Sequence, residues 1–255
     1  MGLILHCGGE PATIDQLAAI PVPHATDTYH PVAHVALIDT VKERMQSILG
    51  MTPTEEAYGT NQEGAQLFGT MRLPHGGQER TLSIGLRNSY NQTLSVGFAA
   101  GAWTLVCDNL CFSGSDVTVV RKHTKNVWRD ILSRVDEALY AAPLAFDRME
   151  WDMEAMKEVP VKHDRGFELL GLAYGHSIIT PQQMSVAVKD WKTPRHEEFS
   201  ERNGYSLYNC VTEGLKKGNA GGAIKRHTKA HAFLSDALSI PPMPITVAAS
   251  YEGGE

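Results

Sequence analysis

The 255-residue sequence lacks most of the features that mark a secreted, membrane-spanning or disulfide-rich protein. Its four cysteines form neither a CxxC pair nor a regular framework, which is typical of reduced thiols in a cytosol. No run of about 18 uncharged apolar residues occurs, so no transmembrane helix is expected. The first residues, MGLILHCGGEP, include no basic leader and no cleavage site of small residues. These absences predict a cytoplasmic protein that does not enter a membrane.

The motifs of several large enzyme classes are also missing. The sequence contains no GxxxxGK[ST], no strand-linked GxGxxG and no GxSxG. Glu213 and Lys216 form an ExxK pair, but no upstream aspartate completes a nuclease motif around them. Enzymatic activity therefore stays open, and the sequence favours a protein that is not an enzyme and that uses no cofactor.

The residue patterns predict an α+β protein. Residues 1–30 are punctuated by proline and glycine and are expected to form an irregular arm. From Val35 onward, apolar residues recur at spacings of three and four, and Gly50 stands where the cap of a helix belongs. Two strand-like runs, residues 65–73 and 80–90, flank PHGGQE and predict a β-hairpin.

Residues 93–114 and 115–123 add further strands, so that a central antiparallel sheet is expected at about residues 64–123. Helices are predicted to follow at residues 126–142, 144–159, 179–191, 206–218 and 224–238. The clearest helix start is at Thr180, where Pro181 can occupy the first helical position and Gln183 can complete a capping box.

These elements divide the chain into four expected parts. They are an irregular N-terminal arm (1–30), an α+β core (31–160), a helical C-terminal region packed on the core (161–240) and a tail (241–255). No low-complexity linker separates them, and the only internal similarity lies in two short basic stretches. The fold class is thus a central sheet with one helix before it and a helical C-terminal half.

The charge of the chain is unevenly placed. The formal net charge is −6, yet Arg121–Arg129 sums to +4 and Glu213–His231 also sums to +4. The two segments contain similar stretches, RKHTK at Arg121–Lys125 and KRHTK at Lys225–Lys229. Concentrated positive charge in an acidic chain indicates local anion-binding surfaces, although solvated helix ends would give the same pattern.

A basic helix start with a hydroxyl group can bind phosphate, because free backbone N–H groups and the helix dipole add to the side-chain charges. The first stretch fits this description, since Thr124 or Asn126 is expected to cap the next helix. The second lies inside a helix that has already begun. Tyr90, in the turn NSYNQ, is the best exposed candidate for stacking on a base. The predicted anion- or nucleic-acid-binding residues are Arg87, Tyr90, Arg121, Lys122, His123, Thr124, Lys125, Lys225, Arg226, His227 and Lys229.

Two histidine pairs have the i, i+4 spacing that places imidazoles on one helical face, as many zinc sites require. They are His30 with His34, and His227 with His231. No glutamate completes an HExxH motif, no third ligand is evident, and His30 precedes a proline. The default interpretation is that no metal binds, and the pairs remain secondary candidates.

Three motifs carry a resemblance to a known family: RNSYN at Arg87–Asn91, VCDN at Val106–Asn109, and RKHTKN at Arg121–Asn126. With them and with longer matches between Pro31 and Ala237, the chain resembles the phage/plasmid-like family, whose members occur in phages, prophages and plasmids and carry a domain of unknown function. The resemblance transfers no catalytic residues. It implies an association with phage or plasmid DNA metabolism or with counter-defence, in the host cytoplasm if the protein is phage-encoded.

Three functions follow as hypotheses. The first is a mobile-element protein that binds single-stranded DNA or a replication or recombination intermediate, assembled as a homo-oligomer so that modest cationic strips join into one track. The second is a counter-defence protein that binds a host defence protein or sequesters a phosphorylated ligand. The third is a metal-dependent hydrolase that uses the histidine pairs. Salt dependence separates the first from binding to a protein partner, because contacts with a phosphate backbone weaken steeply with salt.

Overall fold

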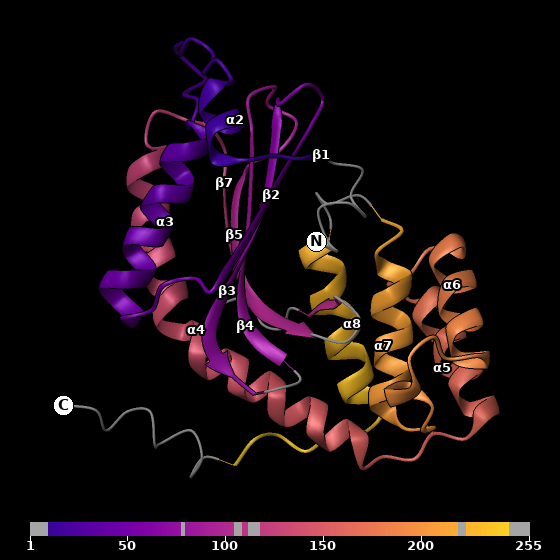
Figure 1. The fold of residues 1–255 in the computed structure, drawn as a ribbon. Coiled ribbons are helices and arrows are strands. Elements are labelled where there is room, and N and C mark those ends of the chain that lie inside the picture. Colours follow the sequence, from indigo (N-terminus) through magenta and orange to yellow (C-terminus); the bar gives the residue numbers. More distant parts are fainter. Residues whose placement is uncertain (1–9, 78–79, 105–108, 112–117, 219–222, 245–255) are drawn as a thin grey trace. The chain divides into compact units, whose positions relative to one another are not determined.

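Figure 1 shows the computed structural model of the chain, which describes residues 10–77, 80–104, 109–111, 118–218 and 223–244. The chain divides into two compact units. Unit 1 comprises Met1–Trp103 and Gly114–Pro143, and unit 2 comprises Thr104–Ser113 and Leu144–Glu255. The division falls within the long helix α4 (Val127–Lys157). The α+β fold class predicted from the sequence is confirmed.

Unit 1 is built on a β-sheet. Its strands are β1 (Glu10–Pro11), β2 (Glu55–Asn61), β3 (Gln66–Gly76), β4 (Arg80–Ser89), β5 (Val96–Thr104) and β7 (Thr118–Arg121). They are ordered β1-β2-β3-β4-β5, with β7 also paired to β5. The predicted hairpin is the antiparallel pair of β3 and β4. The sheet starts earlier in the chain than predicted, because β1 and β2 also belong to it. The sequence of β2, EEAYGTN, alternates only weakly. This strand pairs with β3 and places the ring of Tyr58 against Gly69.

Helix α3 (His34–Leu49) is the predicted first long helix, and it buries Leu37, Ile38, Val41 and Met45. It ends at Gly50, whose φ of 65° is the left-handed conformation that favours glycine. Lys42 of α3 forms an ion pair with Glu56 of β2 at 2.6 Å. The expected irregular arm is more ordered than predicted in its described part, since it contributes β1 and α2 (Ile14–Ala19), with Thr13 completing a capping box.

Unit 2 is mainly helical. Its elements are β6 (Asn109–Cys111), the C-terminal part of α4, α5 (His163–Gly175), α6 (Pro181–Lys192), η1 (Glu197–Phe199), α7 (Gly204–Leu215) and α8 (Ala223–Ala237). Helix α7 packs against α6 and α8 and is buried along nearly its whole length, which makes it the central element of the unit. The capping box predicted at Thr180 is present and starts α6. Within the described residues, no helix combines the length and apolar character needed to cross a bilayer.

The interior of unit 2 contains a close contact between α5 and α6. A Cβ atom at Gly166 would lie 2.2 Å from the indole of Trp191, so only glycine fits there without displacing that ring. The Trp191 Nε1–H group donates a hydrogen bond to the carbonyl oxygen of His163 at 3.0 Å. The Arg202 guanidinium lies 4.5 Å from the centre of the ring. Gly171, on the same helix, faces open space.

Candidate anion-binding pocket

The first basic stretch lies in unit 1, between β7 and α4. Arg121 ends β7, and the chain then turns through a hydrogen bond from the Thr124 N–H group to the Lys122 carbonyl oxygen at 2.8 Å. A second bond, from the Val127 N–H group to the Thr124 carbonyl oxygen at 2.9 Å, leads into α4. The side chains of Lys122 and Lys125 are exposed, and neither forms an ion pair with a described residue. The loop therefore presents two uncompensated positive charges.

A pocket of about 260 Å³ lies beside this loop. Three segments line it: Thr28–Tyr29 of the N-terminal arm, Gln92–Ser95 of the turn before β5, and Lys122–Thr124. The lining residues with aliphatic hydroxyl groups are Thr28, Thr93, Ser95 and Thr124. The described lining residues include no aspartate or glutamate, and Lys122 adds a positive charge. Hydroxyl donors and a cation without an opposing carboxylate are suited to an anion.

His123 stands at the buried side of this pocket. It is 7% exposed, and neither ring nitrogen has a hydrogen-bond partner of normal geometry in the described structure. Its ring lies 5.5 Å from that of Tyr29, and its carbonyl oxygen accepts a hydrogen bond from the His30 N–H group at 2.9 Å. Burial lowers the pKa of His123, although weak hydrogen bonds to the backbone of Leu94 and His30, outside normal geometry, act in the opposite direction. The imidazole is therefore neutral at pH 7, with one N–H group to donate and one nitrogen to accept.

Tyr90 is outside the lining of the pocket, and it binds Tyr29, which belongs to the lining. It is 8% exposed, so the prediction that Tyr90 is exposed and available to stack on a base is wrong. Its carbonyl oxygen accepts a hydrogen bond from the Tyr29 hydroxyl at 2.9 Å, and its own hydroxyl accepts one from the His34 N–H group at 2.9 Å. The His34 ring stacks on it, with 3.8 Å between ring centres. Tyr90 is buried because these two distant residues close over it, and its role is to fix Tyr29 at the pocket.

His34 continues this network into the sheet. Its Nε2 lies 3.0 Å from the Gly64 carbonyl oxygen, so that nitrogen must carry the proton. Its Nδ1 accepts from the Asn88 amide at 2.9 Å, and the same amide nitrogen donates to the Val32 carbonyl oxygen at 2.6 Å. A proton on Nδ1 would point at the Asn88 amide, which is itself a hydrogen-bond donor. Burial lowers the pKa of His34 to about 4, with a smaller contribution from His123 in the same direction.

Arg87 and Arg121 are not in the lining of the pocket. The stem of Arg87 crosses Gly97 of β5, where an added Cβ atom would lie 2.8 Å from it, and burial lowers the pKa of its guanidinium. Arg121 is half-buried, and its guanidinium donates to the Val120 carbonyl oxygen at 3.0 Å. Both arginines thus contribute to the sheet, and their predicted role in binding remains a prediction.

The sequence reasoning missed the arm and turn residues of the pocket. Thr93 and Ser95 closely follow the RNSYN motif, so their position in the sequence was a usable signal. Thr28 and Tyr29 lie more than ninety residues before the basic loop in the chain, and no local pattern points to them. Their place at the pocket depends on the long-range contacts of Tyr90.

The second basic stretch lies in unit 2, on α8. Lys225 and Lys229 are exposed and Arg226 is half-buried, whereas His227 is 3% exposed and belongs to the interior. Burial lowers the pKa of His227 to about 3, and the charges of Arg226 and Lys216 act in the same direction. This stretch belongs to unit 2, whereas the first stretch belongs to unit 1.

The histidine pairs do not form a metal site in the described part of the chain, where no three His, Cys, Asp or Glu side chains gather as ligands. His30 precedes α3, which begins at His34, so the two do not share a helical face as the spacing suggested. His231 pairs with Asp152, its Nε2 lying 2.9 Å from the carboxylate. Both ring nitrogens of His34 are already hydrogen-bonded to the protein.

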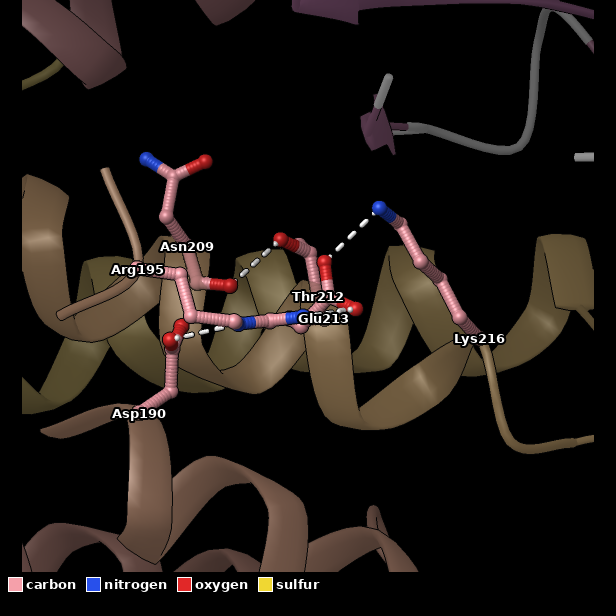
Figure 2. Close-up of polar contacts among 6 residues, drawn as sticks. All are labelled: Asp190, Arg195, Asn209, Thr212, Glu213 and Lys216. Atoms are coloured by element: carbon pink, nitrogen blue, oxygen red, sulfur yellow. Dashed lines mark hydrogen bonds and ion pairs between the residues drawn. The ribbon is translucent and has the colours of Figure 1, made fainter. Parts of the chain in front are cut away.

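A second cluster of charges lies in unit 2 and is shown in Figure 2. Arg195 bridges Asp190 and Glu213 at 2.9 Å each, and Lys216 binds the other oxygen of Glu213 at 2.7 Å. Burial alone would raise the pKa of Glu213, but the bonds from Arg195 and Lys216 lower it below its ordinary value. Burial and Asp190 raise the pKa of the Cys210 thiol. With both carboxylates paired and the thiol protonated, this cluster stabilises the helices and offers no base or nucleophile.

Unit 1 therefore defines an α+β protein with a small polar pocket beside a cationic loop. The chain belongs to the family described as "Domain of unknown function (DUF932)", which matches residues 21–238. The family resemblance inferred from the motifs is thereby confirmed. The UPF0380 protein YafZ of Escherichia coli (strain K12) is 26% identical over 170 residues. These cover 63% of this chain and 59% of YafZ, so the match spans less than two thirds of that protein. No solved structure matches the chain.

Proposed function

We propose that the protein binds single-stranded nucleic acid through the loop at Lys122–Lys125 and the adjoining pocket. The observation that carries this proposal is the pair of exposed lysines, Lys122 and Lys125. Among the described residues they have no ion-pair partner, and the pocket beside them is lined by no carboxylate. Phosphate groups are the anions that neutralise such charges along a nucleic-acid backbone. The occurrence of the family on phages and plasmids, implied by the resemblance, gives this binding a context.

The size of the pocket favours a single strand over a duplex. A volume of about 260 Å³ is just below the range of about 300 Å³ and above in which proteins hold drug-sized ligands. A nucleotide must leave a duplex before it can enter such a space, which costs unstacking energy that a single strand does not require. Because each copy offers only a short cationic loop, we also propose that several copies assemble along one strand.

The proposal is tested by fluorescence anisotropy with labelled single-stranded and duplex oligonucleotides at several salt concentrations. The variant Lys122→Ala/Lys125→Ala is compared with Lys225→Ala/Lys229→Ala, which removes the same charge from the basic stretch of unit 2. The loop variant is expected to weaken binding and to reduce the salt slope for a single strand by about 1.4, since each lost phosphate contact accounts for about 0.7. The α8 variant is expected to bind as the wild type does. Equal losses in the two variants, or no binding at low salt, would reject the site.

The other two hypotheses lead to different outcomes. Binding to a host defence protein through apolar contacts would be nearly independent of salt, and it would survive replacement of Lys122 and Lys125. A hydrolase that used the histidine pairs would need His34 or His231 as a ligand, and both are engaged with protein groups. Metal analysis of the purified protein tests that hypothesis directly.

A further inference from the structure

His123 points to a ligand more specifically than the lysines do. A polar side chain that is 93% buried normally has a hydrogen-bond partner, because burial removes its bonds to water and folding must replace them. Neither ring nitrogen of His123 has a partner of normal geometry, although the ring borders a pocket. A ligand group that enters the pocket can accept a better aligned hydrogen bond from the ring than the backbone of Leu94 and His30 does.

The available donors around His123 are hydroxyl groups and one ammonium group. The side chains of Thr28, Ser95 and Thr124 have no hydrogen bond to a described residue, whereas the Thr93 hydroxyl donates to Asn91 at 2.5 Å and is already occupied. Lys122 adds a positive charge at the same wall. Three hydroxyl groups, one neutral imidazole and one ammonium group can surround a tetrahedral anion from several sides.

The turn that carries the donors is held in place before any ligand arrives. The Asn91 carboxamide oxygen accepts from both the backbone N–H and the hydroxyl group of Thr93, and the Asn91 amide group donates to Gln62. Gln92 has a φ of 62°, a left-handed conformation that is unfavourable for a residue other than glycine. Donors fixed in advance lose little entropy when they bind.

We propose that this pocket is specific for a phosphomonoester, namely the terminal phosphate and adjoining sugar of a nucleotide. Tyr29 and His123 are the buried residues of its lining, and a terminal phosphate, which carries a chain on one side only, can approach them more closely than a phosphodiester can. This inference rests on the proposed function, since it identifies which part of a strand the site holds. A strand end and a free mononucleotide share this chemistry.

The test measures the affinity of the full chain for three probes: one oligonucleotide with a terminal phosphate, at either the 5′ or the 3′ end; the same oligonucleotide without it; and a nucleoside monophosphate. The phosphorylated strand is expected to bind about tenfold more tightly than the unphosphorylated strand, the effect of one or two charge-assisted hydrogen bonds. His123→Phe and the milder pair Ser95→Ala/Thr124→Val should bring the ratio of the two affinities to about one, because this ratio reports the terminal phosphate whatever happens to the affinity for the unphosphorylated strand. Circular dichroism confirms that each variant is folded.

The outcomes separate this inference from the proposed function. Salt-sensitive binding without any preference for the terminal phosphate would overturn the pocket inference and leave strand binding intact. Binding of the monophosphate that is lost in Ser95→Ala/Thr124→Val, without binding of either strand, would support the pocket with a free nucleotide as its ligand and overturn strand binding. Failure of all three probes to bind would overturn both.

Discussion

Acid should weaken unit 1 through His34, and the size of the effect follows from its hydrogen bonds. The ring is 0% exposed, it donates from Nε2 to Gly64, and it accepts at Nδ1 from Asn88. Protonation would place a second N–H group against the Asn88 amide, which cannot turn its oxygen inward without losing its bond to Val32. The folded state therefore resists the charged form, in agreement with a pKa lowered from 6.5 to about 4.

The direction of the pH effect follows from this lowered pKa. Above pH 6.5 the ring is neutral in both the folded and the unfolded state, and the stability contribution is fully present. As the pH falls from 6.5 towards 4, the unfolded chain binds a proton that the folded chain rejects, so stability is lost. The pKa values differ by about 2.5, which corresponds to a total loss of about 3 kcal/mol, of which about 2 kcal/mol is lost by pH 5.

Hydrogen exchange read by mass spectrometry on peptides from β3 and β4, during urea unfolding at pH 7.5 and pH 5, measures unit 1 by itself. His34→Gln should be less stable at pH 7.5 but should lose about 2 kcal/mol less than the wild type on acidification. Asn88→Asp should also flatten the pH dependence, because a carboxylate beside the ring raises the pKa of His34. The reasoning would be refuted if the wild type and His34→Gln lost the same stability between the two pH values.

Two further predictions concern unit 2 and are measured by urea unfolding at pH 7. Gly166→Ala should destabilise the unit by about 1–3 kcal/mol, because the added methyl group must displace Trp191, whereas Gly171→Ala on the same helix should stabilise it by about 0.5–1 kcal/mol. A destabilisation of equal size at both positions would contradict this packing. Glu213→Gln should cost about 2 kcal/mol, since Lys216 and Arg195 lose a charged partner of low exposure, and an unchanged midpoint would show that the cluster contributes nothing.

The elements with strong local signals were predictable from the sequence. The helix before Gly50, the capping box at Thr180 and the hairpin of β3 and β4 each combine a repeating apolar pattern with turn or cap residues. Strand β2 lacks such a pattern, so it is recognised as a strand only through its pairing with β3 in the folded chain.

The site was predicted only in part, for a similar reason. The charge of the loop at Lys122 and Lys125 is a local property that composition reveals. The burial of Tyr90 is a tertiary property, because the polar turn around it is typical of a surface, and it is Tyr29 and His34 that cover the ring. A pocket formed by three segments that are distant in the sequence cannot be recognised from any one of them alone.

The contacts that hold this pocket also constrain the order in which the chain can fold during synthesis. Tyr29 and His34 bond to Tyr90, 61 and 56 residues later, and the His30 N–H group bonds to the carbonyl oxygen of His123. When helix α3 leaves the ribosome, none of these later residues has been made. The contacts of His34 and of the arm before α3 must therefore wait until Tyr90 and then His123 emerge, and the closure of a long loop adds an entropic cost to each step. A nascent chain that stops before His123 has no pocket, so ligand binding by ribosome-bound chains of increasing length would reveal the residue at which unit 1 becomes complete.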